Sequence, residues 1–139
     1  MKPAILVVDC DLGFVFWLGR ILDGAGYEAF PARNVPDALK LITELHLSAN
    51  LIIINYSLSG AATLIATIRR AQKSLKVMAL VKDASGPTPP AADAQYCKPR
   101  KINEDLTGAE MLRIIRGLLS KREVIEVRSS SVPSRAHGS

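Results

Sequence analysis

Short apolar runs alternate with amphipathic segments along most of this chain, and this alternation constrains the fold more than any other feature. Ala4–Asp9 and Leu51–Ile54 are rich in aliphatic residues and predict buried strands. Between them, one helical face recurs at i, i+3, i+4, i+7, i+8 and i+11: Phe14, Trp17, Leu18, Ile21, Leu22 and Ala25. Strands that alternate with helices form a parallel sheet with right-handed crossovers and helices on both faces.

The remaining elements follow from the same two periodicities. In chain order they are a strand over Tyr27–Phe30, a helix over Val35–Leu45 capped by Asn34, the strand at Leu51–Ile54, a helix over Ala61–Ala71, a strand over Lys76–Val81, a strand at Tyr96–Cys97 and a long last helix capped by Asn103. The apolar face of the last helix comprises Leu106, Met111, Leu112, Ile115, Leu118 and Leu119.

Prolines interrupt the alternation before the last strand. The segment Gly86-Pro87-Thr88-Pro89-Pro90 is incompatible with a helix interior, because proline lacks the amide donor and clashes with the preceding turn. We expect a loop there, with at most one helical turn around Ala91–Ala94. The predicted fold is therefore a flavodoxin-like, doubly wound, five-stranded parallel sheet of order 2-1-3-4-5, with its fourth helix short or absent.

Composition indicates one domain over residues 1–122 and a tail, residues 123–139, that we expect to be disordered because periodicity fades and Ser and Pro increase. No apolar run approaches the roughly 20 residues of a membrane span. The first apolar stretch ends at Asp9, too early for a secretory signal, so a cytoplasmic location is the default expectation. Cys10 and Cys97 are expected to be reduced thiols.

The formal net charge of +5 raises the question of nucleic-acid binding. Much of the excess lies along and around the last helix, without interleaved aromatic residues and without a recognisable nucleic-acid-binding module. A solvated basic helix face is the better explanation.

Polar residues follow three of the predicted strands: Asp9-Cys10-Asp11, Asn55 and Lys98. Because the carboxyl ends of parallel strands meet at one edge of the sheet, we expect these residues to lie together. An acid cluster, a strand-end aspartate and a lysine in these places would form a phosphate-accepting aspartyl site. The central position here is an amide, which is not a nucleophile.

The chain resembles the receiver domains of bacterial two-component response regulators in five stretches: Ile5–Asp11, Gly26-Tyr27, Ala38-Leu39, Leu51–Asn55 and Lys98-Pro99. The likeness extends from about Lys2 to Arg122. By this resemblance, Asp9 and Cys10 occupy the positions of two Mg²⁺-binding acids and Asn55 that of the phosphate acceptor. Val81 occupies the position of a hydroxyl residue that contacts the phosphoryl group, and Lys98 that of the conserved lysine of the pattern.

Three of these positions depart from the family pattern. Asn55 has no anionic oxygen with which to attack phosphorus, the Cys10 thiol is a poor Mg²⁺ ligand, and Val81 cannot donate a hydrogen bond. Asp11 is a further candidate metal ligand, although the sequence does not say whether it points inward. We expect no metal site, Mg²⁺ binding weakened or lost, and Lys98 paired with Asp9 or hydrogen-bonded to Asn55.

The family also uses an aromatic switch residue near the last strand. Gln95 occupies that position, and the aromatic residue Tyr96 lies one place along, so strand alternation turns Tyr96 toward the other face.

The resemblance implies a receiver-like signalling module that is not an enzyme. The favoured hypothesis is a stand-alone, phosphorylation-independent adaptor that binds a protein partner such as a histidine kinase or regulator, with a homodimer through the last helix left open. One alternative is an active receiver that uses Asp9 or Asp11 as acceptor with Mg²⁺. The others are nucleic-acid binding through the basic last helix, and a nucleotide or flavin at the sheet edge, against which the absence of a Gly-rich phosphate loop argues.

Overall fold

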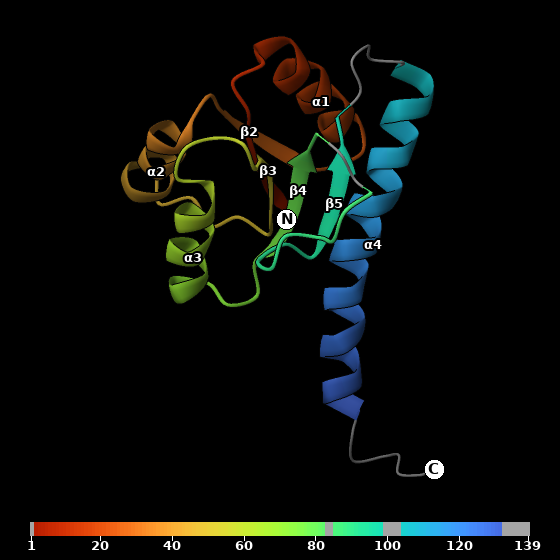
Figure 1. The fold of residues 1–139 in the computed structure, drawn as a ribbon. Coiled ribbons are helices and arrows are strands. Elements are labelled where there is room, and N and C mark those ends of the chain that lie inside the picture. The colour runs from red at the N-terminus through yellow and green to blue at the C-terminus, as the bar shows by residue number, and fades with distance from the viewer. Residues whose placement is uncertain (1, 83–84, 99–103, 132–139) are drawn as a thin grey trace.

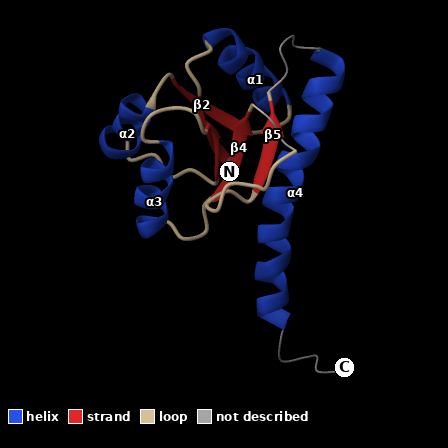
Figure 2. Cartoon of the chain, in the orientation of Figure 1, coloured by secondary structure: helices blue, strands red, loops and turns tan. Residues whose placement is uncertain are grey.

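The computed structural model describes residues 2–82, 85–98 and 104–131. Its elements are β1 (Ala4–Val8), α1 (Leu12–Gly24), β2 (Glu28–Ala32), α2 (Val35–Glu44), β3 (Leu51–Asn55), α3 (Ala61–Ala71), β4 (Lys76–Val81), β5 (Ala94–Cys97) and α4 (Glu104–Ser131). The strands form one parallel sheet of order β2-β1-β3-β4-β5 (Figures 1 and 2). The predicted sheet order is therefore confirmed.

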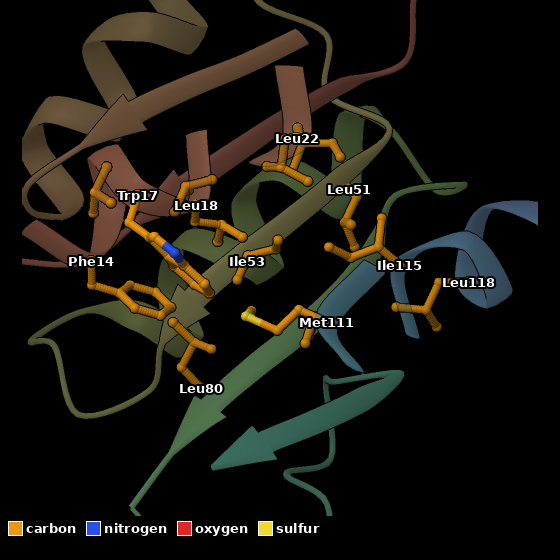
Figure 3. Close-up of a cluster of buried hydrophobic side chains, with 14 of the residues drawn as sticks. Phe14, Trp17, Leu18, Leu22, Leu51, Ile53, Leu80, Met111, Ile115 and Leu118 are labelled. Atoms are coloured by element: carbon orange, nitrogen blue, oxygen red, sulfur yellow. The ribbon is translucent and has the colours of Figure 1, made fainter. Parts of the chain in front are cut away.

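Each face of the sheet carries its own hydrophobic core. On β1, Ile5 and Val7 join the core beneath α1 and α4, whereas Leu6 and Val8 join the core beneath α2 and α3. β3 alternates in the same way, so β1 and β3 are buried on both faces. Figure 3 shows side chains of α1 and α4 meeting those of the central strands in the first core.

α1 and α4 lie close together at a glycine of α4. A Cβ added to Gly108 would approach Ile21 Cδ1 to 2.7 Å, so the end of the Ile21 side chain would have to shift to accept a larger residue. Trp17 lies beside this contact, with its ring centroid 5.8 Å from that of Phe14. Its buried Nε1 has no hydrogen-bond partner among the described residues.

The last helix confirms most of its predicted apolar face, since Met111, Ile115, Leu118 and Leu119 are buried. The side chain of Leu106, the Asn103 cap and residues 132–139 lie outside the described residues. α4 continues past Arg122 to Ser131 and projects beyond the other elements (Figure 1). The predicted domain boundary at residue 122 stays a prediction. No helix in the described part of the chain is both long and apolar enough to cross a membrane.

The described residues between β4 and β5 contain turns and no helix, as the prolines predicted. A single turn, in which the Ala92 amide donates to Pro89 O at 2.9 Å, stays within the expected limit of one turn. Asp93 then extends the sheet edge, because its amide donates to Val77 O at 2.8 Å and its carboxylate accepts from Val77 N at 2.8 Å. Arg69 of α3 ties this segment down through Ala91 O at 2.7 Å and Asp93 Oδ2 at 2.7 Å.

Candidate functional site

Asp9 is the centre of the candidate site. It directly follows β1, and the Asp9 residue is 0 % exposed. Its Oδ2 accepts a hydrogen bond from Lys98 Nζ at 2.9 Å, while its Oδ1 accepts from Asn55 Nδ2 at 3.3 Å and from the Asp11 amide at 3.1 Å. The ends of β1, β3 and β5 therefore meet, and the expected pairing of Lys98 with Asp9 is present.

Lys98 is held on several sides at once. Its Nζ lies 3.6 Å from Asp11 Oδ2 and 5.0 Å from the centre of the Phe14 ring, within the range of a cation–π contact. Burial alone lowers the pKa of Lys98, but the hydrogen bond and charge of Asp9, with the charge of Asp11, outweigh it and raise the pKa above its ordinary value. Lys98 is therefore a permanent cation at neutral pH, and it neutralises the buried Asp9.

The Asn55 amide uses both of its ends within the protein. Nδ2 donates to Asp9, and Oδ1 accepts from the Ser57 amide at 2.9 Å and from Ser57 Oγ at 2.7 Å. A carboxylate at Asn55 would replace the donor with an anion beside Asp9, and two like charges at that distance disfavour joint ionisation. The amide is therefore the residue that this arrangement of neighbours fits.

Cys10 and Asp11 lie at the start of α1, and neither completes a Mg²⁺ site. Cys10 is exposed, and Asp11 caps the helix by accepting from Phe14 N at 3.1 Å. Both oxygens of Asp9 already accept hydrogen bonds, including one from a cation. Among the described residues, no group of three or more His, Cys, Asp or Glu is placed to hold a metal ion. Mg²⁺ prefers hard oxygen ligands, so the Cys10 thiol is a poor donor and the carboxylates near it are those of Asp9 and Asp11, both of which contact Lys98.

A pocket of about 310 Å³ opens beside the site, lined by Asn55, Tyr56, Ser57, Leu80, Val81, Lys82 and Lys98. Val81 is half-buried in this wall and contributes no donor. The hydroxyl nearest to Asn55 comes instead from Ser57, which the sequence analysis did not single out. The signal for Ser57 was its place two residues after an asparagine, where an Asx-type turn brings the two together.

Gln95 and Tyr96 point to opposite faces of β5, as alternation predicted. Tyr96 packs against the core beneath α1 and α4, and its hydroxyl donates to Glu110 Oε1 on α4 at 3.3 Å. Burial, with the neighbouring Glu110, raises the pKa of Tyr96. Gln95 Nε2 donates to Gly86 O at 2.8 Å. Neither side chain lines the pocket at Asn55.

Comparison with known proteins identifies the fold. No family model and no curated protein matches the sequence. Among solved structures, a CheY-like receiver domain from Methanospirillum hungatei matches with TM-score 0.71 and 21 % identity over 88 % of this chain and 98 % of that one. The response regulator TrrA from Thermotoga maritima, solved in complex with Mg²⁺ and BeF, matches with TM-score 0.66 and 27 % identity over 86 % and 100 %.

NtrX from Brucella abortus matches over 95 % of this chain but only 29 % of its own length, with TM-score 0.74 and 21 % identity. The chain therefore has the fold of CheY-like response regulator receiver domains, as predicted. The likeness is one of fold, so the roles assigned above to Asn55, Val81 and Lys98 remain predictions.

Proposed function

We propose that the chain is a pseudo-receiver, a signalling module of the two-component type that binds protein partners without being phosphorylated. One observation carries this proposal: the buried Asp9 carboxylate is already satisfied by Lys98, Asn55 and the Asp11 amide. The group that would receive phosphate is an amide, and the groups that would hold Mg²⁺ are either engaged or exposed.

The electrostatics support a fixed conformation at this site. In an active receiver, the phosphoryl group adds negative charge, and the lysine pairs with it. Here Lys98 is neutralised by Asp9 and Asp11 without any phosphoryl group. The site then connects the ends of β1, β3 and β5 through an ion pair and hydrogen bonds. The surface that binds a partner therefore does not require a phosphorylation-dependent change of conformation. The partner class that fits is a histidine kinase or another regulator.

The direct test is treatment with acetyl phosphate and Mg²⁺, read by intact mass. We expect no mass gain for the wild-type chain and none for Asn55→Asp alone, because Cys10 still withholds a Mg²⁺ ligand. Asn55→Asp combined with Cys10→Asp is the positive control, since it restores both carboxylates. A stable phosphoryl adduct on the wild type would overturn the proposal and make Asp9 or Asp11 the acceptor.

A second arm tests partner binding. Proteins captured by the tagged chain from its own cells should be the same in EDTA as in Mg²⁺ with acetyl phosphate. A partner that is gained or lost between these conditions would show that binding depends on phosphorylation.

A further inference from the structure

The loop before β5 contains a run rich in proline, Pro87-Thr88-Pro89-Pro90, the proline segment. Proline fixes its own φ at about −65° and restricts the residue before it to extended or polyproline II backbone. Because Thr88 and Pro89 each precede a proline, both are restricted in this way. Residues 87–89 are accordingly neither helix, strand nor turn in the structure. Covalent geometry therefore favours polyproline II backbone in the segment before any partner binds.

The two outer prolines of the segment are both exposed. Pro87, Thr88 and Pro90 are exposed, whereas Pro89 is half-buried. A polyproline II helix has about three residues per turn, so we expect Pro87 and Pro90 to lie on one edge and Pro89 on another. The segment therefore presents two rings to solvent at the spacing of a Pro-x-x-P motif.

Hydrogen bonds hold the loop on both sides of the segment. Gln95 Nε2 on β5 donates to Gly86 O at 2.8 Å, directly before the first proline. Directly after the last proline, Ala91 O accepts from Arg69 at 2.7 Å, and Ala91 and Ala92 pack against the core beneath α2 and α3. A segment with held ends and restricted dihedral angles has little conformational entropy to lose on binding, which lowers the cost of forming a complex.

The segment has no charge with which to select a partner. Residues 85–92 contain no Asp, Glu, Lys, Arg or His. The carboxylate of the next residue, Asp93, accepts hydrogen bonds from Arg69 and from the Val77 amide within the chain. Recognition must therefore use the proline rings, and the protein surfaces that bind such rings are grooves lined by aromatic side chains.

A second copy of this chain does not offer such a groove. An aromatic-lined groove requires more than one aromatic side chain on the surface. Among the described residues, Phe16 is the one exposed aromatic side chain, and its neighbour Trp17 is buried. The partner that matches the proline segment is therefore a different protein.

We propose that the proline segment binds a partner protein through an uncharged, aromatic-lined groove of the WW type, with Pro87 and Pro90 as the two contact residues. This inference does not rest on the proposed function, because the segment is exposed whether or not the site at Asn55 accepts phosphate. Asn55→Asp should leave the binding unchanged, so each of the two proposals can fail alone.

The first test is an NMR titration of the isotope-labelled full chain with an isolated WW domain, of the class that binds uncharged proline-rich peptides. The domain is added up to about 1 mM, the range that detects a weak complex. We expect shifts at the amides of Thr88 and Ala91, next to the two contact prolines. The same domain with its groove tryptophan replaced by alanine should cause none. No shift in the segment over this range, or equal shifts with the altered domain, would overturn the proposal.

Substitutions along the segment give the second test. Pro87→Ala and Pro90→Ala should each weaken binding at least about fivefold, because each removes a ring from the contact edge. Thr88→Ala should weaken it less than about twofold, because Thr88 lies on a different edge. Pro36→Ala is the matched control, since Pro36 is an exposed proline in the first turn of α2 and should leave binding unchanged. Circular dichroism confirms that the variants fold. Binding that resists both Pro87→Ala and Pro90→Ala would contradict the assigned contact.

Discussion

At the scale of single residues, the site illustrates what a sequence can and cannot reveal. The pairing of Lys98 with Asp9 was predictable, because Asn55 and Cys10 remove two carboxylates and leave the lysine with few other anions. The two bonds from Ser57 to Asn55 had only a weak local signal, the serine two residues after an asparagine, and the capping of α1 by Asp11 was not predicted. The sequence shows which chemical groups are present at the site, whereas it does not show the direction in which a side chain points from a turn.

We predict that Lys98→Met destabilises the protein by about 3 kcal/mol or more, because removing one partner of a buried ion pair leaves an uncompensated buried charge. Urea denaturation measures the loss. Lys82→Met, at an exposed lysine of the same pocket, is the control and should change stability by about 0.5 kcal/mol or less. Adding Asp9→Asn to Lys98→Met should recover part of the loss, and failure to do so would mean that Lys98 acts through packing alone.

The raised pKa of Lys98 also predicts a pH dependence. A lysine whose pKa is higher in the folded state than in the unfolded one stabilises the fold fully below the unfolded value of about 10.4, and this contribution disappears as pH rises through the folded value. The raised pKa values of Tyr56 and Tyr96 act in the same direction. Stability curves should therefore fall above about pH 10, and less steeply for Lys98→Met than for the wild type. Equal slopes would contradict the pairing.

At the scale of elements, the segment before β5 shows how a helix is replaced. Prolines predicted the absence of a helix, because their effect on the backbone is local. The role of Asp93 at the edge of β4 was not predictable, because its partners Arg69 and Val77 come from elsewhere in the chain. Three hydrogen bonds from Arg69, to Ala91 O, Leu75 O and Asp93, hold the segment where a helix would otherwise pack.

We predict that Arg69→Met costs about 1–2 kcal/mol, because the bonds to Ala91 O and Leu75 O are partly buried and these acceptors would lose a charged donor. Hydrogen exchange should accelerate at the amides of Val77 and Asp93. Arg70→Met is the matched control on the same helix, since Arg70 is exposed and its bond to Thr67 Oγ1 is long, at 3.4 Å. Unchanged exchange in Arg69→Met would show that the prolines alone hold the segment.

At the scale of the whole molecule, the fold and the chemistry of the site are separable. Asp9 and Thr107 are the only buried polar residues among those described, so nearly all of the two cores is apolar and independent of the site. The succession of strands and helices was predictable for this reason, since apolar periodicity marks the residues of both cores, and the sheet order followed from the flavodoxin-like architecture. A surface groove beside α1, lined in part by Phe16, was not predictable. Phe16 is exposed, and an exposed residue does not alter the apolar pattern from which strands and helices are predicted.

Trp17 is the one tryptophan of the chain, so its fluorescence reports on the contact between α1 and α4. The residue is 4 % exposed and packs beside Gly108, and its indole nitrogen has no hydrogen-bond partner among the described residues. Indole emission shifts to longer wavelength when water reaches the ring. The molecule therefore has an intrinsic fluorophore at one helix interface, and a displacement of α4 that exposes Trp17 to water would shift its emission to longer wavelength.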